Sequence, residues 1–130
     1  MSAARRWAEA YEHAWRAGDG EAAGALYAQD CEFRSSPFRG REDARAYMLR
    51  VFGEASARDV WFGDPVESGE RAAIEYWALL VELDGSESTL AGCHVVRFRA
   101  DGLVAAAQDY WHLEAGHRPP PEGWGRSESL

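Results

Sequence analysis

Two Asp-Gly pairs, Asp84-Gly85 and Asp101-Gly102, divide the second half of the chain into long strand-like segments. Each segment is rich in residues that favour β-strands, and Asp-Gly between such segments is typical of a tight β-hairpin turn. The segments cover residues 71–83, 88–99 and 102–113. The sequence therefore predicts three antiparallel strands in a meander, preceded by a shorter strand over 58–66.

The first half of the chain has helical periodicity instead. Apolar residues recur at helical spacing from Trp7 to Trp15, and Gly18 ends this helix. Asp19 can cap a short second helix that extends to Tyr27. The remaining elements are an extended segment at 31–35 and a third helix at 42–52, ended by Gly53. Because one face of an antiparallel sheet must be covered, we expect an α+β fold in which a curved antiparallel sheet wraps around three N-terminal helices.

Length and composition indicate one folded domain followed by a distinct tail. The chain has 130 residues, is 46% hydrophobic and contains six tryptophans. Residues 1–114 are expected to form the domain. Residues 115–130 contain three consecutive prolines, which exclude a helix or a central strand. We expect this tail to pack across the domain or onto a partner subunit through Trp124, with a disordered tail as the alternative.

The charge balance argues against two classes of partner. Fourteen basic and twenty-two acidic residues give a net charge of -8, which disfavours nucleic acid and anionic membranes. No apolar run reaches the length of a transmembrane helix, and the N-terminus has no signal-peptide core. Cys31 and Cys93 have neither metal-site spacing nor the number needed for a disulfide framework. We expect a cytoplasmic protein with reduced thiols.

One carboxylate, Asp109, stands in uncharged surroundings on the last predicted strand. Alternation places five apolar residues on its face, Leu103, Ala105, Ala107, Trp111 and Leu113. An acid among apolar residues is costly to bury unless it is paired, protonated or used. Asp109 is therefore the first candidate catalytic residue. The alternative is an acid at a strand end that meets water or an arginine.

His94 is the candidate partner of Asp109. It shares an apolar strand face with Val96 and Phe98. Antiparallel pairing about the turn at 100–102 brings it close to residues 108–110. A His–Asp pair inside a cavity can move protons near neutral pH. The alternative is a histidine whose hydrogen bonds are satisfied within the core.

Aromatic residues supply candidates for ligand binding. A pocket for a planar, apolar ligand could be lined by Tyr11, Trp15, Tyr27, Phe33, Trp61, Trp77, Tyr110 and Trp111. Any one of them can equally be an ordinary core residue, because the sequence alone does not say which sheet face is inward.

The sequence lacks the motifs of phosphate-binding, nucleophilic and metal-dependent enzymes. The chain has no Gly-rich phosphate loop and no nucleophile elbow. Its histidines do not fall at chelating spacing; they are His13, His94, His112 and His117. We therefore expect no metal and no cofactor, and cofactor-free acid–base chemistry if the protein is an enzyme.

Four segments resemble the SnoaL-like group of polyketide cyclases and relatives, within the nuclear transport factor 2-like superfamily. They are FRGREDARAYM at 38–48, AAIEYWALLVELDG at 72–85, LAGCHVVRFRADGLV at 90–104 and QDYW at 108–111. The resemblance implies a cone-shaped fold with a deep apolar pocket and, often, a homodimer formed through the outer sheet face. The superfamily contains cyclases, ketosteroid isomerases, epoxide hydrolases and proteins without chemistry, so the fold does not define the activity.

The resemblance also implies roles for the two candidate residues. In SnoaL-like cyclases an acid on the last strand removes a C–H proton from a ketone, and a histidine on the preceding strand lies nearby. Asp109 and His94 stand at about these positions. The leading expectation is cofactor-independent acid–base catalysis on an apolar polycyclic or ketone-like metabolite. The alternatives are a non-catalytic module that binds a small apolar ligand and a dimerisation domain.

Overall fold

The computed structural model describes residues 1–129 and consists of helices followed by a sheet. The helices are α1 Ala3–Ala17, α2 Gly20–Gly24 and α3 Ala44–Glu54, and strand β1 Tyr27–Arg34 lies between α2 and α3. The later strands are β2 Ala55–Phe62, β3 Val66–Ser68, β4 Arg71–Glu82, β5 Glu87–Phe98 and β6 Val104–Ala115. The predicted α+β class and the predicted order of elements are confirmed.

The strands form one sheet in the order β1-β6-β5-β4-β2, and β3 pairs with β4. The Asp-Gly turns join β4 to β5 and β5 to β6 as predicted, and Gly85 and Gly102 both have a φ of 86°. All neighbours are antiparallel except β1 and β6, which are parallel. The expectation of a wholly antiparallel sheet is therefore wrong at this edge. No turn joins β1 to β6, so no hairpin signal indicated their relative direction.

Short polar caps define the helix ends. Asp19 caps α2 by accepting a hydrogen bond from the backbone of Ala22, and Gly18 ends α1 with a φ of 68°, both as predicted. Asp43 caps α3 in the same way. These local bonds satisfy backbone donors that have no partner within their own helix.

Several predicted boundaries were wrong by a few residues. α2 ends at Gly24, and Tyr27 belongs to β1, where it is fully buried and pairs with Val104. α3 continues through Gly53 because the chain passes directly into β2 without an intervening turn. The strand expected over 58–66 is divided into β2 and β3, since the chain breaks at 63–65.

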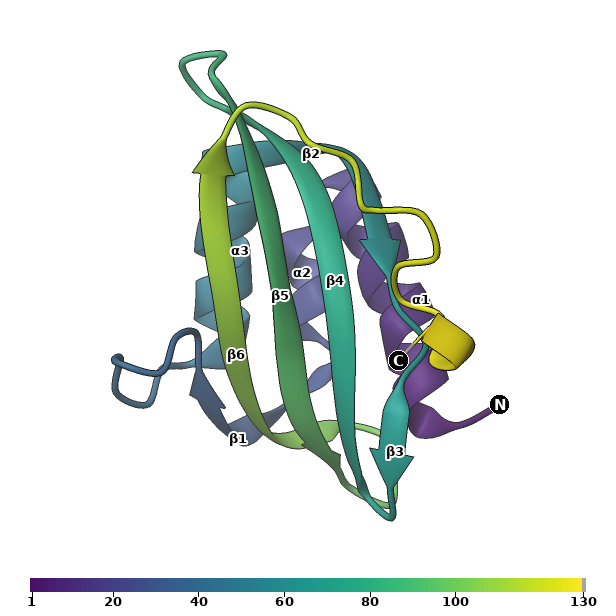
Figure 1. The fold of residues 1–130 in the computed structure, drawn as a ribbon. Helices are drawn as coiled ribbons and strands as arrows, with labels where there is room; N and C mark the ends of the chain where they lie inside the picture. Colours follow the sequence, from purple (N-terminus) through teal and green to yellow (C-terminus); the bar gives the residue numbers. More distant parts are fainter. Residues whose placement is uncertain (130) are drawn as a thin grey trace.

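The core lies between the helices and one face of the sheet. Figure 1 shows the three helices behind the sheet, which curves around them. Strand β4 alternates with the period expected of a half-buried strand, so Ile74, Tyr76 and Ala78 face the helices. Trp7 of α1 and Met48 of α3 pack into one cluster with Ile74. The opposite side of the sheet is called the outer face below.

A bulge at the start of β6 decides which of its residues face the core. Phe98 pairs with Val104 and Arg97 pairs with Ala106, which leaves Ala105 as the extra residue. The simple alternation predicted for this strand is therefore wrong before Ala106: Val104 is buried in place of its two neighbours. Beyond the bulge the prediction holds for Asp109, whose cross-strand partner is His94.

The tail packs on the outer face over β4 and β2. It leaves the end of β6 and crosses the sheet toward β3 (Figure 1). The indole N–H of Trp77 donates to the carbonyl of Arg118 at 2.7 Å, and Trp124 meets Trp77 edge to face at 5.9 Å between centroids. Regular structure was not expected here, but a 3₁₀ turn occupies Ser127–Ser129.

Within residues 1–129, none of the helices is both long enough and apolar enough to span a membrane.

Candidate functional site

A cavity of about 110 Å³ lies between the helices and the inner face of the sheet. Its walls are mainly aromatic and aliphatic, with contributions from α1, β1, α3, β2, β4, β5 and β6. The lining includes the polar side chains of Tyr11, Tyr47, Tyr76, His94 and Asp109, together with the indoles of Trp7 and Trp15. The two residues singled out from the sequence therefore meet in one apolar cavity.

Asp109 is held through one of its two oxygens. Its Oδ1 accepts a hydrogen bond of 2.8 Å from the Tyr76 hydroxyl and lies 3.4 Å from His94 Nδ1. No donor among residues 1–129 hydrogen-bonds to Oδ2. The Asp109 side chain is 15% exposed, so this carboxylate is largely removed from water yet not sealed. Oδ2 is the oxygen that remains available to accept a proton.

His94 is enclosed on several sides. Its side chain is 4% exposed, and its ring stacks on Trp7 with centroids 5.1 Å apart and planes at 12°. Nε2 lies 2.8 Å from the Tyr27 hydroxyl. When Tyr27 donates to Nε2, the ring proton is placed on Nδ1, which faces Asp109. The 3.4 Å from Nδ1 to Oδ1 is long for a hydrogen bond.

Tyrosine hydroxyls surround this pair and stay protonated at neutral pH. Removal from water raises the pKa of Tyr76 well above its usual value, and the negative charge of Asp109 raises it further. The same two effects, with burial the larger, raise the pKa values of Tyr11 and Tyr47. Burial also raises the pKa of Tyr27. The cavity therefore combines one carboxylate with several neutral hydrogen-bond donors.

Tyr11 is a donor with a weak partner. Its hydroxyl donates to the thioether sulfur of Met48 at 3.3 Å, and a thioether is a poor acceptor. A ligand oxygen could replace that sulfur at little cost.

The aromatic residues proposed from the sequence separate into three groups. Tyr11, Trp15 and Phe33 line the cavity. Tyr27 is fully buried behind His94 and is not part of the lining. The other four, Trp61, Trp77, Tyr110 and Trp111, lie outside it.

Strand geometry explains why those four residues do not reach the cavity. Trp61 and Trp77 are cross-strand neighbours on the outer face, where the tail covers Trp77. Tyr110 also points outward and is 44% exposed. Trp111 has the parity of Asp109, but β1 accompanies β6 only as far as Gln108, so Trp111 is 39% exposed. The placement of these four residues in the pocket is corrected accordingly.

Sequence reasoning missed Trp7, Tyr47 and Tyr76, and of these Tyr76 contacts Asp109. The sequence feature that could have identified Tyr76 is its cross-strand partner, Gly92. A Cβ at position 92 would lie 2.7 Å from the Tyr76 hydroxyl oxygen and 2.3 Å from the carbonyl oxygen of Tyr110. A glycine inside a strand marks a close approach of another group, and here that group is the hydroxyl that reaches Asp109.

Two other kinds of reactive site find little support in the described residues. Over residues 1–129, no three His, Cys, Asp or Glu side chains gather in a way that could hold a metal ion. Both cysteines are free thiols, and burial raises the pKa of Cys31 to about 11, which keeps it protonated at neutral pH.

Solved structures with similar folds include enzymes of different activities. A Δ5-3-ketosteroid isomerase from Mycobacterium sp. has a TM-score of 0.67 and 20% identity, covering 86% of this chain and 95% of that one. An LEH-like epoxide hydrolase of M. tuberculosis has a TM-score of 0.68 and 18% identity, covering 85% and 83%. An NTF2-like protein of unknown function from Burkholderia pseudomallei has a TM-score of 0.65 and 19% identity, covering 86% and 92%.

These likenesses establish the fold and leave the activity open, because the identities are low. No curated protein sequence matches the chain. The model of the SnoaL-like domain, in contrast, matches residues 7–107, which include most of α1, strands β4 and β5 with His94, and the start of β6 as far as Ala107. The chain therefore belongs to the SnoaL-like domain family and has the NTF2-like fold.

Proposed function

We propose that this protein catalyses cofactor-independent proton abstraction from a small, apolar, ketone-like molecule, with Asp109 as general base. One observation carries the proposal: a carboxylate stands in an aromatic cavity with Oδ1 held by Tyr76 and near His94, while Oδ2 accepts no hydrogen bond from residues 1–129. A base fixed through one oxygen presents the other in a defined direction, which lowers the entropic cost of proton transfer.

The chemistry assigns a role to each side of the cavity. A C–H proton next to the substrate carbonyl passes to Asp109 Oδ2, and the C–H electron pair moves into the enolate. The enolate oxygen accepts a hydrogen bond from a neutral tyrosine, for which Tyr11 is suited because its present acceptor is a thioether. Neutral donors directed at developing charge supply a large part of such catalysis. Asp109 then returns the proton to the same or another carbon and becomes a carboxylate again, which Tyr76 and His94 hold in place for the next cycle.

The volume of the cavity narrows the class of substrate. Sites for drug-sized ligands span about 300–1,000 Å³, and a dry cavity near 150 Å³ holds benzene. A cavity of about 110 Å³ is smaller than one that holds benzene and therefore suits a short open-chain ketone. The polycyclic substrate considered from the sequence would require the cavity to widen. A ketone with a short apolar body fits both the size and the lining.

Exchange of substrate hydrogen for deuterium tests this proposal directly. In D₂O, the wild-type protein should speed loss of the protons next to the carbonyl of acetone or butanone, followed by proton NMR. Asp109→Asn keeps the shape and removes the base, so the exchange rate should fall by about 10²–10⁴. Asp30→Asn is the matched control, because that carboxylate is 88% exposed on β1 and should leave the rate unchanged.

The same samples separate catalysis from simple binding, the second function that the apolar lining favours. Ketones that bind to the wild-type protein without exchange above the buffer rate would contradict catalysis and leave a binding module. Exchange that survives Asp109→Asn would remove Asp109 as the base. We retain two further proposals from the sequence: a homodimer and a cytoplasmic location.

A further inference from the structure

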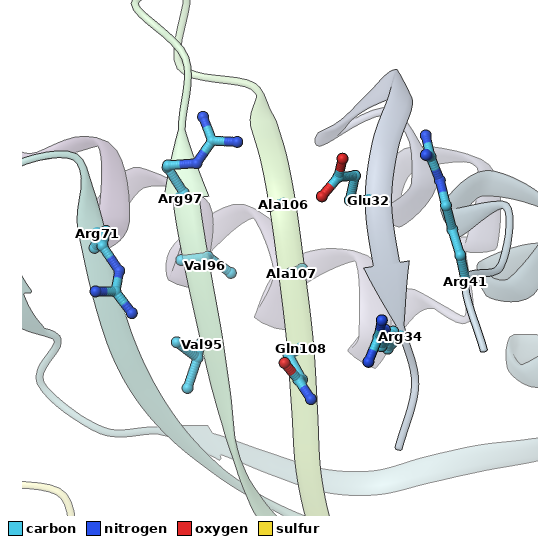
Figure 2. Close-up of a pocket in the computed structure, with 10 residues that line it drawn as sticks. All are labelled: Glu32, Arg34, Arg41, Arg71, Val95, Val96, Arg97, Ala106, Ala107 and Gln108. Carbon is cyan, nitrogen blue, oxygen red and sulfur yellow. The ribbon is translucent and has the colours of Figure 1, made fainter. Parts of the chain in front are cut away.

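The outer face of the sheet carries a second concave site, separate from the aromatic cavity. It is a groove of about 580 Å³ at the end of the sheet where β1, β6, β5 and β4 run side by side. Figure 2 shows Arg71 and Arg97 on one side of β6, and Glu32, Arg34 and Arg41 on the other. We call this the arginine groove.

The register of the sheet explains how the groove is built. One row across the four strands contains Glu32, Ala106, Arg97 and Arg71, and the next contains Arg34, Gln108 and Val95. Because the side chain of Ala106 is small, the surface is depressed between the charged residues on either side of it. Long side chains that flank a short one form a depression, and here four of the five charged side chains are guanidinium groups.

Two of these arginines lie where their positive charges repel each other. Arg71 and Arg97 are directly opposite each other on β4 and β5, and like charges in that arrangement destabilise a sheet. Within residues 1–129, no carboxylate lies within 4.0 Å of the charged groups of Arg34, Arg71 or Arg97, although the chain has twenty-two acidic residues. A cluster of four arginines and one glutamate, in which these three arginines form no ion pair with residues 1–129, has the composition of an anion site.

We propose that the arginine groove binds a compact oxyanion with at least two negative charges, such as a diphosphate or an organic phosphate. Guanidinium groups bind such oxyanions through paired, charge-assisted hydrogen bonds. Arg71 and Arg97 hold one end of the anion, and Arg34 with Arg41 holds the other. Glu32, at the rim, accepts a hydrogen bond from a hydroxyl or amino group of the same molecule. A small ligand is favoured over a flat protein partner because the groove is concave and has the volume of a small-molecule site.

Inorganic pyrophosphate is the probe for this proposal. Titration calorimetry of the full chain at low salt should give one saturable site, and pyrophosphate should raise the melting temperature. Arg71→Gln and Arg97→Gln should each weaken binding about tenfold or more, since each removes a charged hydrogen-bond donor. Arg58→Gln on β2 is the matched control, with the same change in charge at an exposed position outside the groove, and should retain wild-type affinity.

The variants also show whether they remain folded. Each groove variant removes one charge of the opposed Arg71–Arg97 pair, so without pyrophosphate its melting temperature should equal or exceed that of the wild type. Three results would overturn the proposal. They are no saturable binding by the wild type, equal weakening by Arg58→Gln, and a groove variant that turns a dimer into a monomer, which would make the groove an interface between copies.

Discussion

At the scale of single residues, the site depends on how Tyr76 reaches Asp109. Its hydroxyl passes over Gly92, where a Cβ would clash with that oxygen and with the backbone of Tyr110. Because Gly92 has no side chain, it leaves the space in which the Tyr76 hydroxyl contacts the Asp109 carboxylate. The need for glycine at position 92 of β5 therefore follows from how the proposed base on β6 is oriented.

The consequence can be measured with two Gly→Ala variants of opposite expected sign. Gly92→Ala should lower the free energy of unfolding by about 1–3 kcal/mol, the usual cost of overpacking, and should slow ketone exchange. Gly53→Ala should be neutral or stabilising by up to about 1 kcal/mol, since position 53 lies in α3 with nothing within 4 Å of a new Cβ. Urea unfolding provides both values. Equal stability of the two variants would show that Tyr76 moves aside without cost.

The buried phenols give a second expectation at this scale, concerning pH. Burial raises the folded-state pKa values of Tyr11, Tyr27, Tyr47 and Tyr76 above the unfolded value near 10. Their contribution to stability is complete below about pH 10, where both states keep the proton. Above that pH the unfolded chain loses protons that the folded chain retains, so the free energy of unfolding should fall.

Tyrosinate absorbance checks this expectation. Tyr110→Phe removes the remaining tyrosine, which is 44% exposed, so the absorbance change of that variant reports the other four alone. These four should ionise together with unfolding and not before it. Ionisation at about pH 10 with the fold intact would contradict their enclosure.

At the scale of elements, the sequence was most informative where signals are local. The two Asp-Gly turns set the register of the meander, and that register alone placed His94 opposite Asp109. The parallel pairing of β1 with β6 has no comparable signal, because the two strands are far apart in the chain. The bulge at Ala105 also has none, since strict alternation is the default expectation for a strand.

The candidate site was predictable in the same uneven way. A polar residue on an apolar strand face identified Asp109 and His94. Aromatic composition did not separate Tyr11, in the cavity, from Trp77, on the outer face, because both lie on periodic and apolar elements. The difference depends on which face the helices cover, and that is a property of the tertiary packing.

At the scale of the whole molecule, the two faces of the sheet carry different features. The inner face closes around a small aromatic cavity, while the outer face carries the arginine groove at one end and the tail at the other. β5 and β6 contribute neighbouring residues to both sides: His94 and Asp109 face inward, and Val95 and Gln108 face outward. A homodimer formed through the outer face would have to accommodate both the groove and the tail.

The tail connects several parts of the molecule. Trp124 packs edge to face on Trp77, and the carbonyl of Gly125 accepts a hydrogen bond from the backbone of Asp64 at 2.6 Å. The side chain of Asp64 in turn accepts hydrogen bonds from Ser127 and lies 3.6 Å from Arg5 of α1. The tail thus links β4, the loop after β2 and the first helix, and is packed against the domain.

Removal of residues 116–130 should therefore destabilise the domain. Trp124→Ala isolates the aromatic contact, and loss of an edge-to-face pair costs about 0.5–1.5 kcal/mol beyond its buried area. For a chain of this size that corresponds to a fall in melting temperature of about 3 °C or more, with a larger fall for the truncation. Arg126→Ala is the control, because that side chain is exposed within the same segment. Analytical ultracentrifugation of the truncated chain shows whether the tail also affects association. Unchanged melting temperature and unchanged mass after truncation would mean that these contacts contribute nothing to the folded state.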